Sequence, residues 1–341
     1  MDETEKIMKT IFSAVLLVTT LSVSAQNLGD LLTSGLNDAE RFANAYTAPA
    51  TEAVIYGLSS GWYNSADAKP LGGFEISVIG NFTGFKNKED KRSFTLNVAD
   101  YENIRFSDGS QSKQVSTALG DIEGVEILVE DSNGLFSEPF ELPAGLSAEG
   151  IDFVPSGFIQ GSVGLFKGLE VKARFLPKVK NDDVAIGLLG AGLQYDFTKL
   201  LPADKLLPVA ISAVVGYTSL TGDFNLNDTN VVDGENQRLE TNFNTWNFSA
   251  VVSTRNIPVI NFYGALGYVT GTSNIDVLGT YRVTSGPFQQ TYTDPFSLVN
   301  DVNGVVATLG TKLKLGFFRI NVDYNMGEFN TLTAGVNFGF R

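Results

Sequence analysis

Two segments at the C-terminal end of the chain alternate apolar and polar side chains. The apolar positions are Phe318, Ile320, Val322, Tyr324 and Met326, and then Leu332, Ala334, Val336, Phe338 and Phe340. Polar residues or glycine occupy the positions between them. A period of two places alternate side chains on opposite faces of a strand. The sequence therefore predicts two strands, each with one apolar face and one polar face.

The final residues, Phe338-Gly339-Phe340, are typical of outer-membrane β-barrels, in which a last aromatic strand closes the cylinder. After residue 25 no run of 18 uncharged apolar residues occurs, so helical membrane spans are not expected. The 35 glycines and 11% aromatic residues suit many antiparallel strands joined by tight turns. We predict an all-β fold, a single transmembrane antiparallel β-barrel of about 10–14 strands with an N-terminal helical segment or plug.

Residues 1–25 have the pattern of a secretory signal peptide. Lys9 precedes the uncharged stretch from Ile11 to Leu21, and Val23-Ser24-Ala25 supplies small residues for cleavage before Gln26. Eleven such residues are too few to span a bilayer, which needs about 20. Because the lead before Lys6 is acidic, Met8 is an alternative start. The expected location is the outer membrane of a Gram-negative cell.

Composition excludes several classes of function. The net charge of −14 and the lack of a basic patch argue against nucleic acid as a partner. The chain has no Cys, so no disulfide framework is expected. It also has no His, which rules out Ser-His-Asp catalysis and His-based zinc sites. We therefore expect no enzymatic activity, no cofactor and no metal site.

Residues 27–48 show apolar side chains at helical spacing, and Pro49 is predicted to end this helix. Two interpretations remain open: a helix that packs under or inside the barrel, or a plug that gates the lumen. The expected division of the chain is a signal peptide at 1–25, a helix or plug segment at 26–66, and a barrel at 67–341.

Alternating patterns predict ten strands. Residues 85–152 are expected to add either two more strands or one elaborate external loop, and twelve strands is the central estimate for the barrel. The ten are 71–84, 153–165, 167–178, 183–197, 207–222, 239–254, 258–271, 303–315, 316–327 and 331–341. Loop lengths place 223–237 and 272–301 outside the cell, the second with a hairpin arm at 275–283. The same assignment predicts an aromatic girdle at one rim: Phe166, Tyr195, Phe197, Phe262, Tyr263, Phe317, Phe318, Phe338 and Phe340.

Two short motifs resemble known sites but lack parts of them. The glycines of 187–192 resemble part of a dinucleotide fingerprint, yet they lie in a strand pattern, where close packing or room in the lumen explains them better. Residues 223–228 begin like a calcium loop, but Asp228 and Gly234 stand where that loop needs Gly and Glu.

Charged residues lie on the parity of the strands that should face the lumen. An Arg or Lys facing lipid at the bilayer midplane would cost about 2–4 kcal/mol. Two interpretations remain: an ion-pair network that fills a narrow barrel, or a polar lining that anchors a ligand. The candidate lumen-lining and ligand-binding residues are Glu170, Lys172, Arg174, Lys312, Arg319 and Asp323.

Three stretches carry a resemblance to a known family: 61–76, 164–177 and the C-terminal strand pair. Together they resemble an uncharacterised family of Gram-negative outer-membrane proteins, a domain of unknown function that spans nearly the whole mature chain. The layout is also distantly similar to the FadL-type long-chain fatty-acid transporters, which implies a helical hatch, long external loops and one barrel. The fourteen strands expected of that type exceed the estimate for this chain.

The leading hypothesis is passive uptake or binding of a small hydrophobic or amphipathic molecule, entering through 223–237 and 272–301 and released by movement of 27–66. The alternative is a structural or secretion-associated barrel that docks protein partners. In either case the expected partners are the lipid bilayer with its lipopolysaccharide and the outer-membrane assembly machinery.

Overall fold

The computed structural model describes residues 31–130, 136–180, 184–202, 206–226, 233–255, 257–283 and 290–340. The predicted signal peptide and the alternative start at Met8 lie outside these residues.

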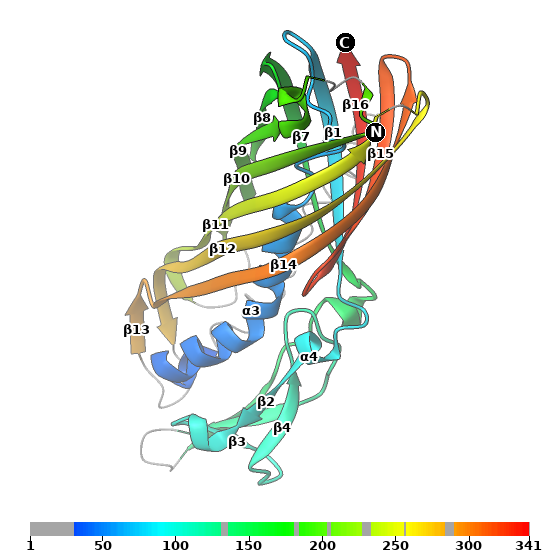
Figure 1. Ribbon diagram of the computed structural model, residues 1–341. Coiled ribbons are helices and arrows are strands. Elements are labelled where there is room, and N and C mark those ends of the chain that lie inside the picture. The colour runs from blue at the N-terminus through cyan, green and yellow to red at the C-terminus, as the bar shows by residue number, and fades with distance from the viewer. Residues whose placement is uncertain are drawn as a thin grey trace, which may run out of the picture.

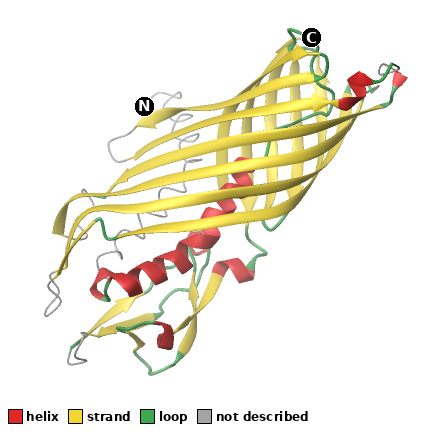
Figure 2. Cartoon of the chain, turned by 60° about the vertical axis from the view of Figure 1, so that its left-hand side comes forward, coloured by secondary structure: helices red, strands yellow, loops and turns green. Residues whose placement is uncertain are grey.

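Ten antiparallel strands form a closed ring (Figures 1 and 2). In ring order they are β1 (Phe74–Gly84), β7 (Phe153–Phe166), β8 (Leu169–Lys180), β9 (Val184–Asp196), β10 (Val209–Asn225), β11 (Asp233–Thr254), β12 (Ile260–Val283), β14 (Phe296–Leu315), β15 (Phe318–Met326) and β16 (Asn330–Phe340). The ring closes where β1 pairs with β16, from Phe74 opposite Phe340 to Gly84 opposite Asn330. A short strand, β13 (Gln290–Thr293), pairs with the end of β12.

The ten segments with alternating patterns are the ten strands of this ring, so the fold class is confirmed. The central estimate of twelve strands is wrong, because the described residues of 85–152 add no strand to the barrel. They form a separate unit beyond its end, the loop subdomain (Figure 1). Its elements are α4 (Glu89–Arg92), β2 (Ser93–Asn97), η1 (Val98–Asp100), β3 (Ile104–Phe106), β4 (Ser112–Ser116), β5 (Glu126–Glu130), β6 (Ser137–Glu141) and η2 (Leu146–Glu149).

The two ends of the barrel differ in their connections. At the short-turn rim, where β16 ends, tight turns join β7 to β8 and β14 to β15, and η3 (Phe197–Leu200) begins the connection from β9 to β10. At the opposite end, the loop rim, the subdomain and the long ends of β10, β11, β12 and β14 project beyond the barrel (Figure 2). Since outer-membrane barrels have short periplasmic turns and longer external loops, the short-turn rim faces the periplasm.

The outer surface carries an apolar band of membrane width. On β10 the outward positions run from Val209 to Tyr217 as apolar or aromatic residues, and beyond them Ser219, Thr221 and Asp223 are polar. Strands β11 and β12 change in the same way on the loop-rim side of Trp246 and Tyr268: the outward residues are polar before Trp246 in β11 and after Tyr268 in β12. The nine residues from Val209 to Tyr217 match the 9–11 residues that a tilted strand needs to cross a bilayer. This band places the protein in the outer membrane as a β-barrel.

Aromatic side chains border the band on both sides. Of the predicted girdle residues at the short-turn rim, those with exposed rings are Phe166, Phe197, Phe262, Phe317, Phe338 and Phe340. Tyr217, Trp246 and Tyr268 form a second border toward the loop rim. The prediction that Tyr263 belongs to the girdle is wrong: its side chain lies in the lumen, only 4% exposed, where its hydroxyl donates to Asp323 at 2.8 Å. Its neighbour Phe262 faces lipid, and consecutive residues of a strand point to opposite faces.

The helix α3 (Leu36–Ser59) runs from the loop subdomain into the barrel (Figure 1) and contacts β1, β7, β10, β11, β12, β14 and β16. The prediction that Pro49 ends it is wrong, since Pro49 lies inside the helix. A proline inside a helix removes one backbone hydrogen bond. Packing on both sides of it, with Tyr46 and Ala53 buried, compensates for that loss.

From Ala50 to Lys69 the chain occupies the lumen, and we call this stretch the lumen segment. An eight-stranded ring is filled by its own side chains, and the extra width of ten strands accommodates the helix. A cavity beside Tyr56 and Tyr63 measures 10 Å³, about the space of one water. After the helix, Trp62 packs against Gly192 of β9 and Gly216 of β10. Of the 187–192 glycines, Gly192 is therefore a close-packing position, as one of the two interpretations of this stretch expects.

Replacing Gly216 by alanine is expected to lower the free energy of unfolding by about 1–3 kcal/mol, because the wall has no space for a methyl group there. A Cβ on residue 216 would overlap the Trp62 ring. Gly161→Ala is the matched control, since a Cβ there meets no atom within 4 Å. Denaturant unfolding in detergent, followed by tryptophan fluorescence, compares the two. Equal midpoints would contradict the packing.

Candidate functional site

Five of the six candidate residues are buried on the inner face of the barrel, and the sixth, Arg319, is mostly buried there. Lys172 is 4% exposed and Lys312 is 5% exposed. The candidates do not form one site, however. Arg174 and Asp323 belong to separate groups deeper in the lumen. The other four gather at the short-turn rim: Glu170, Lys172, Lys312 and Arg319.

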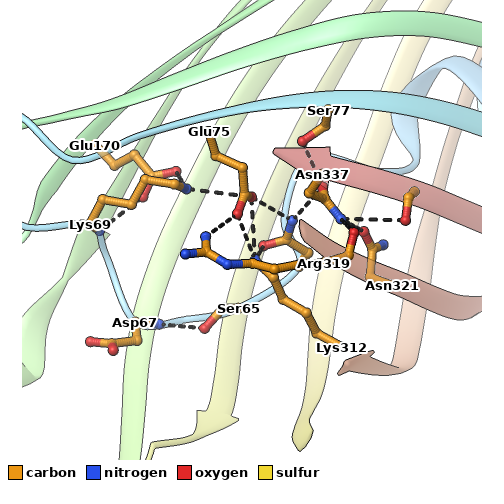
Figure 3. Close-up of polar contacts among 12 residues, drawn as sticks. Ser65, Asp67, Lys69, Glu75, Ser77, Glu170, Lys312, Arg319, Asn321 and Asn337 are labelled. Carbon is orange, nitrogen blue, oxygen red and sulfur yellow. Dashed lines mark hydrogen bonds and ion pairs between the residues drawn. The ribbon is translucent and has the colours of Figure 1, made fainter. Parts of the chain in front are cut away.

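Glu75 on β1 is the centre of the group at the rim (Figure 3). Its carboxylate accepts from Arg319 at 2.6 Å and from Lys312 at 3.1 Å, and Lys69 lies 3.7 Å away. The amide of Asn64 donates to the same carboxylate at 2.9 Å. One buried carboxylate thus joins β1, β14, β15 and the lumen segment.

Glu170 on β8 extends this group to the next part of the wall. It accepts from the side chain of Lys69 at 3.0 Å and from its backbone N–H at 3.1 Å, and Lys172 lies 3.1 Å away. We call the six charged residues the rim cluster: Lys69, Glu75, Glu170, Lys172, Lys312 and Arg319. It contains four cations and two carboxylates.

A pocket of 220 Å³ opens beside the rim cluster. Its lining adds the cation Lys314 and the carboxylate Asp67 to members of the cluster. Asp67 already has its own partners, Lys199 at 2.9 Å and Arg255 at 3.1 Å. The lining is therefore positive in a chain whose overall charge is −14, which suits a ligand with an anionic group.

Arg174 holds the end of helix α3 rather than lining the pocket. Its guanidinium donates to the carbonyls of Leu58 and Ser60, each at 2.7 Å, and to the Gln160 side chain at 2.8 Å. The group also lies 3.6 Å from the centre of the Trp62 ring. A cation at a helix C-terminus satisfies unpaired carbonyls and interacts favourably with the helix dipole. Arg174 therefore attaches the lumen segment to the wall.

Asp323 belongs to a hydrogen-bonded group of polar side chains. It accepts from Tyr263 at 2.8 Å and from Asn325 at 2.8 Å, and Asn321 lies nearby. No ion pair joins it to another described residue. Asp323 therefore belongs to the polar side chains that pack between the wall strands inside the barrel.

Sequence reasoning missed Glu75 and Lys69. Glu75 lies between the outward residues Phe74 and Ile76, so the rule of alternation that identified Lys172 also assigns it to the lumen. Lys69 lies in an irregular stretch without any period. Only the folded lumen segment brings it to Glu170.

At the loop rim, helix α3 is fixed to the loop subdomain. Two backbone N–H groups, of Glu102 and Asn103, donate to Asp38 at 2.9 and 2.8 Å. Lys91 of α4 donates to Glu52 at 2.7 Å. Burial lowers the pKa of Lys91, but the hydrogen bond to Glu52 and the nearby carboxylates outweigh burial and raise it. Lys91 therefore stays charged at neutral pH and holds the helix in place.

Within the described ranges, no group of three or more His, Cys, Asp or Glu side chains is arranged to hold a metal ion. The calcium-like motif at 223–228 lies partly outside those ranges, and its Asp223 pairs with Lys178 at 2.8 Å. No helix in the described part of the chain has the length and apolar character to cross a membrane.

Several solved structures are similar to this chain at low scores. The attachment invasion locus protein Ail of Yersinia pestis is 9% identical, with a TM-score of 0.27, over 80% of this chain and 100% of that one. The outer membrane protease OmpT of Escherichia coli is 9% identical, with a TM-score of 0.32, over 81% and 100%. The toluene transporter TodX of P. putida is 8% identical, with a TM-score of 0.26, over 83% and 93%. No curated protein sequence matches significantly.

One family of sequences matches nearly the whole chain, from residue 4 to residue 340. The match includes every strand of the barrel, the lumen segment and the loop subdomain. The chain therefore belongs to the family of unknown function DUF6588.

Proposed function

We propose that this outer-membrane barrel binds a small amphipathic molecule in the pocket at its short-turn rim and lets it pass only when the lumen segment moves. The observation that carries the proposal is a 220 Å³ pocket at the end of an otherwise filled lumen. The absence of His from the chain supports a binding role without catalysis.

Entry from the loop rim is closed in this state. Apolar residues of β12 and β14 pack with Leu32 and Phe42 at the start of the helical region and with residues of the loop subdomain. Passive uptake through 223–237 and 272–301 would therefore require both the subdomain and the helix to move. A ligand can reach the pocket more directly from the short-turn rim.

Two measurements test this proposal. In planar lipid bilayers we expect the purified protein to give no steady conductance, because the lumen segment blocks ion flow. Mass spectrometry of organic extracts should find a small amphipathic molecule in near-stoichiometric amount. A large steady conductance would contradict the closed lumen, and repeated extracts without any such molecule would contradict ligand binding.

A structural or assembly barrel that docks a protein partner is the second candidate. The observation in its favour is the lumen itself, which is sealed by buried ion pairs and by Arg174. Against it, Phe136 is the one large apolar side chain well exposed in the described part of the loop subdomain. A barrel that is empty by mass spectrometry yet co-purifies with one protein in fixed ratio would favour this candidate.

A further inference from the structure

We propose that the rim cluster is a phosphate-binding site, so that the ligand of the pocket carries a phosphate group. This inference rests on the proposed binding function and names the chemistry of its ligand. It starts from an imbalance of buried charge: four cations, from Lys69, Lys172, Lys312 and Arg319, share two carboxylates.

The imbalance has a physical cost. A charge taken out of water needs a partner, and an uncompensated buried charge is strongly destabilising. Lys172 and Lys312 are almost fully buried. The neutral group that accepts from Lys312 is the amide oxygen of Asn64, at 2.8 Å, and it brings no negative charge. An anion carrying about two charges would neutralise the excess, and a phosphate monoester carries about 1.5 to 2 at neutral pH.

The geometry of the pocket fits such a group. Its cations come from four parts of the chain: the lumen segment, β8, β14 and β15. Figure 3 shows Lys69, Lys312 and Arg319 gathered around Glu75. Lys314 is a fifth cation of the lining and makes no ion pair with any described residue. The volume of 220 Å³ is below the roughly 300–1,000 Å³ of sites that enclose drug-sized ligands. It therefore suits a head group rather than a whole lipid.

The phosphate could belong to a lipid or to a soluble molecule, and a matched pair of ligands separates the two sources. Dihexanoylphosphatidate and dihexanoylglycerol have the same tails and differ in the phosphate. We expect isothermal titration calorimetry on the full chain in an uncharged detergent to show at least about tenfold tighter binding of phosphatidate, since charge-assisted hydrogen bonds are strong. Displacement by inorganic phosphate would indicate a soluble ligand, and its failure to displace would indicate a lipid head group.

Lys314→Gln locates the site without breaking an ion pair in the described structure. It should weaken phosphatidate binding about tenfold and leave dihexanoylglycerol unchanged. Lys178→Gln is the control, because it removes the same charge at the loop rim, where Lys178 pairs with Asp223. Folding of each variant is checked by its heat-dependent gel mobility.

The outcomes separate this inference from the function on which it rests. Equal affinity for the two ligands, or unchanged phosphatidate binding by folded Lys314→Gln, would overturn the phosphate site and leave amphipath binding intact. Binding of neither ligand, together with extracts that contain no small molecule, would overturn both.

Discussion

Arg174→Ala should lower the stability of the barrel by at least about 3 kcal/mol and give it a measurable conductance. The substitution leaves the carbonyls of Leu58 and Ser60 and the side chain of Gln160 without their donor. Each buried polar group that loses its partner costs about 1–3 kcal/mol. The end of helix α3 also loses the cation that interacts with its dipole. The lumen segment should then leave its position more often.

Two readouts check this prediction: the midpoint of denaturant unfolding and single-channel recording in planar bilayers. Arg282→Ala is the matched control, because Arg282 is partly exposed beyond the loop rim and pairs there with Asp233 and Glu235. Exposed ion pairs contribute only about 0–1 kcal/mol. If the Arg174→Ala protein is as stable as this control and conducts no more current than it, Arg174 does not hold the lumen segment.

Glu75→Gln should lower the free energy of unfolding by about 3–5 kcal/mol, the range for removing one partner of a buried ion pair. The change leaves Lys312 and Arg319 without their shared carboxylate, and it weakens the position of Lys69. Glu240→Gln, at an exposed pair with Arg238, is the control and should cost less than about 1 kcal/mol.

A double-mutant cycle tests the cause of that loss. If repulsion and desolvation of the unpaired cations dominate, Lys312→Met in the Glu75→Gln background should recover part of the stability. Urea unfolding of the four proteins in detergent gives the coupling energy. Losses that simply add would mean that Glu75 and Lys312 act independently, against the contact at 3.1 Å.

Alternation of side chains was sufficient to predict the barrel. Each wall strand has one face toward lipid, so its period of two survives along the whole band, as in β16 from Leu332 to Phe340. The pattern fails in 85–152, where five short strands pack on a helix and on one another. There the sequence alone left two strands or one large loop open. It also missed the continuation of α3 past Pro49, which depends on packing from distant segments.

The same rule placed the candidate side chains in the lumen but could not pair them. Glu75 and Lys312 are 237 residues apart in the chain. Which inward residues meet depends on the tilt and stagger of the strands, which follow from closing the ring. Partners from the lumen segment, such as Lys69 and Asn64, have no periodic signal. Their part in the rim cluster became visible only in the folded structure.

Apart from the pocket at the short-turn rim, the lumen is filled by the lumen segment and by inward side chains of the wall, and thiol reactivity tests this most directly. The chain has no Cys, so single Ser→Cys changes at Ser59, Ser77, Ser212 and Ser249 place one small reporter each in the lumen. With a charged, water-soluble thiosulfonate, these thiols should react at least about a hundredfold more slowly than one at the exposed Ser112. Lumen thiols that react as fast as that of Ser112→Cys would reveal a water-filled channel and contradict the account.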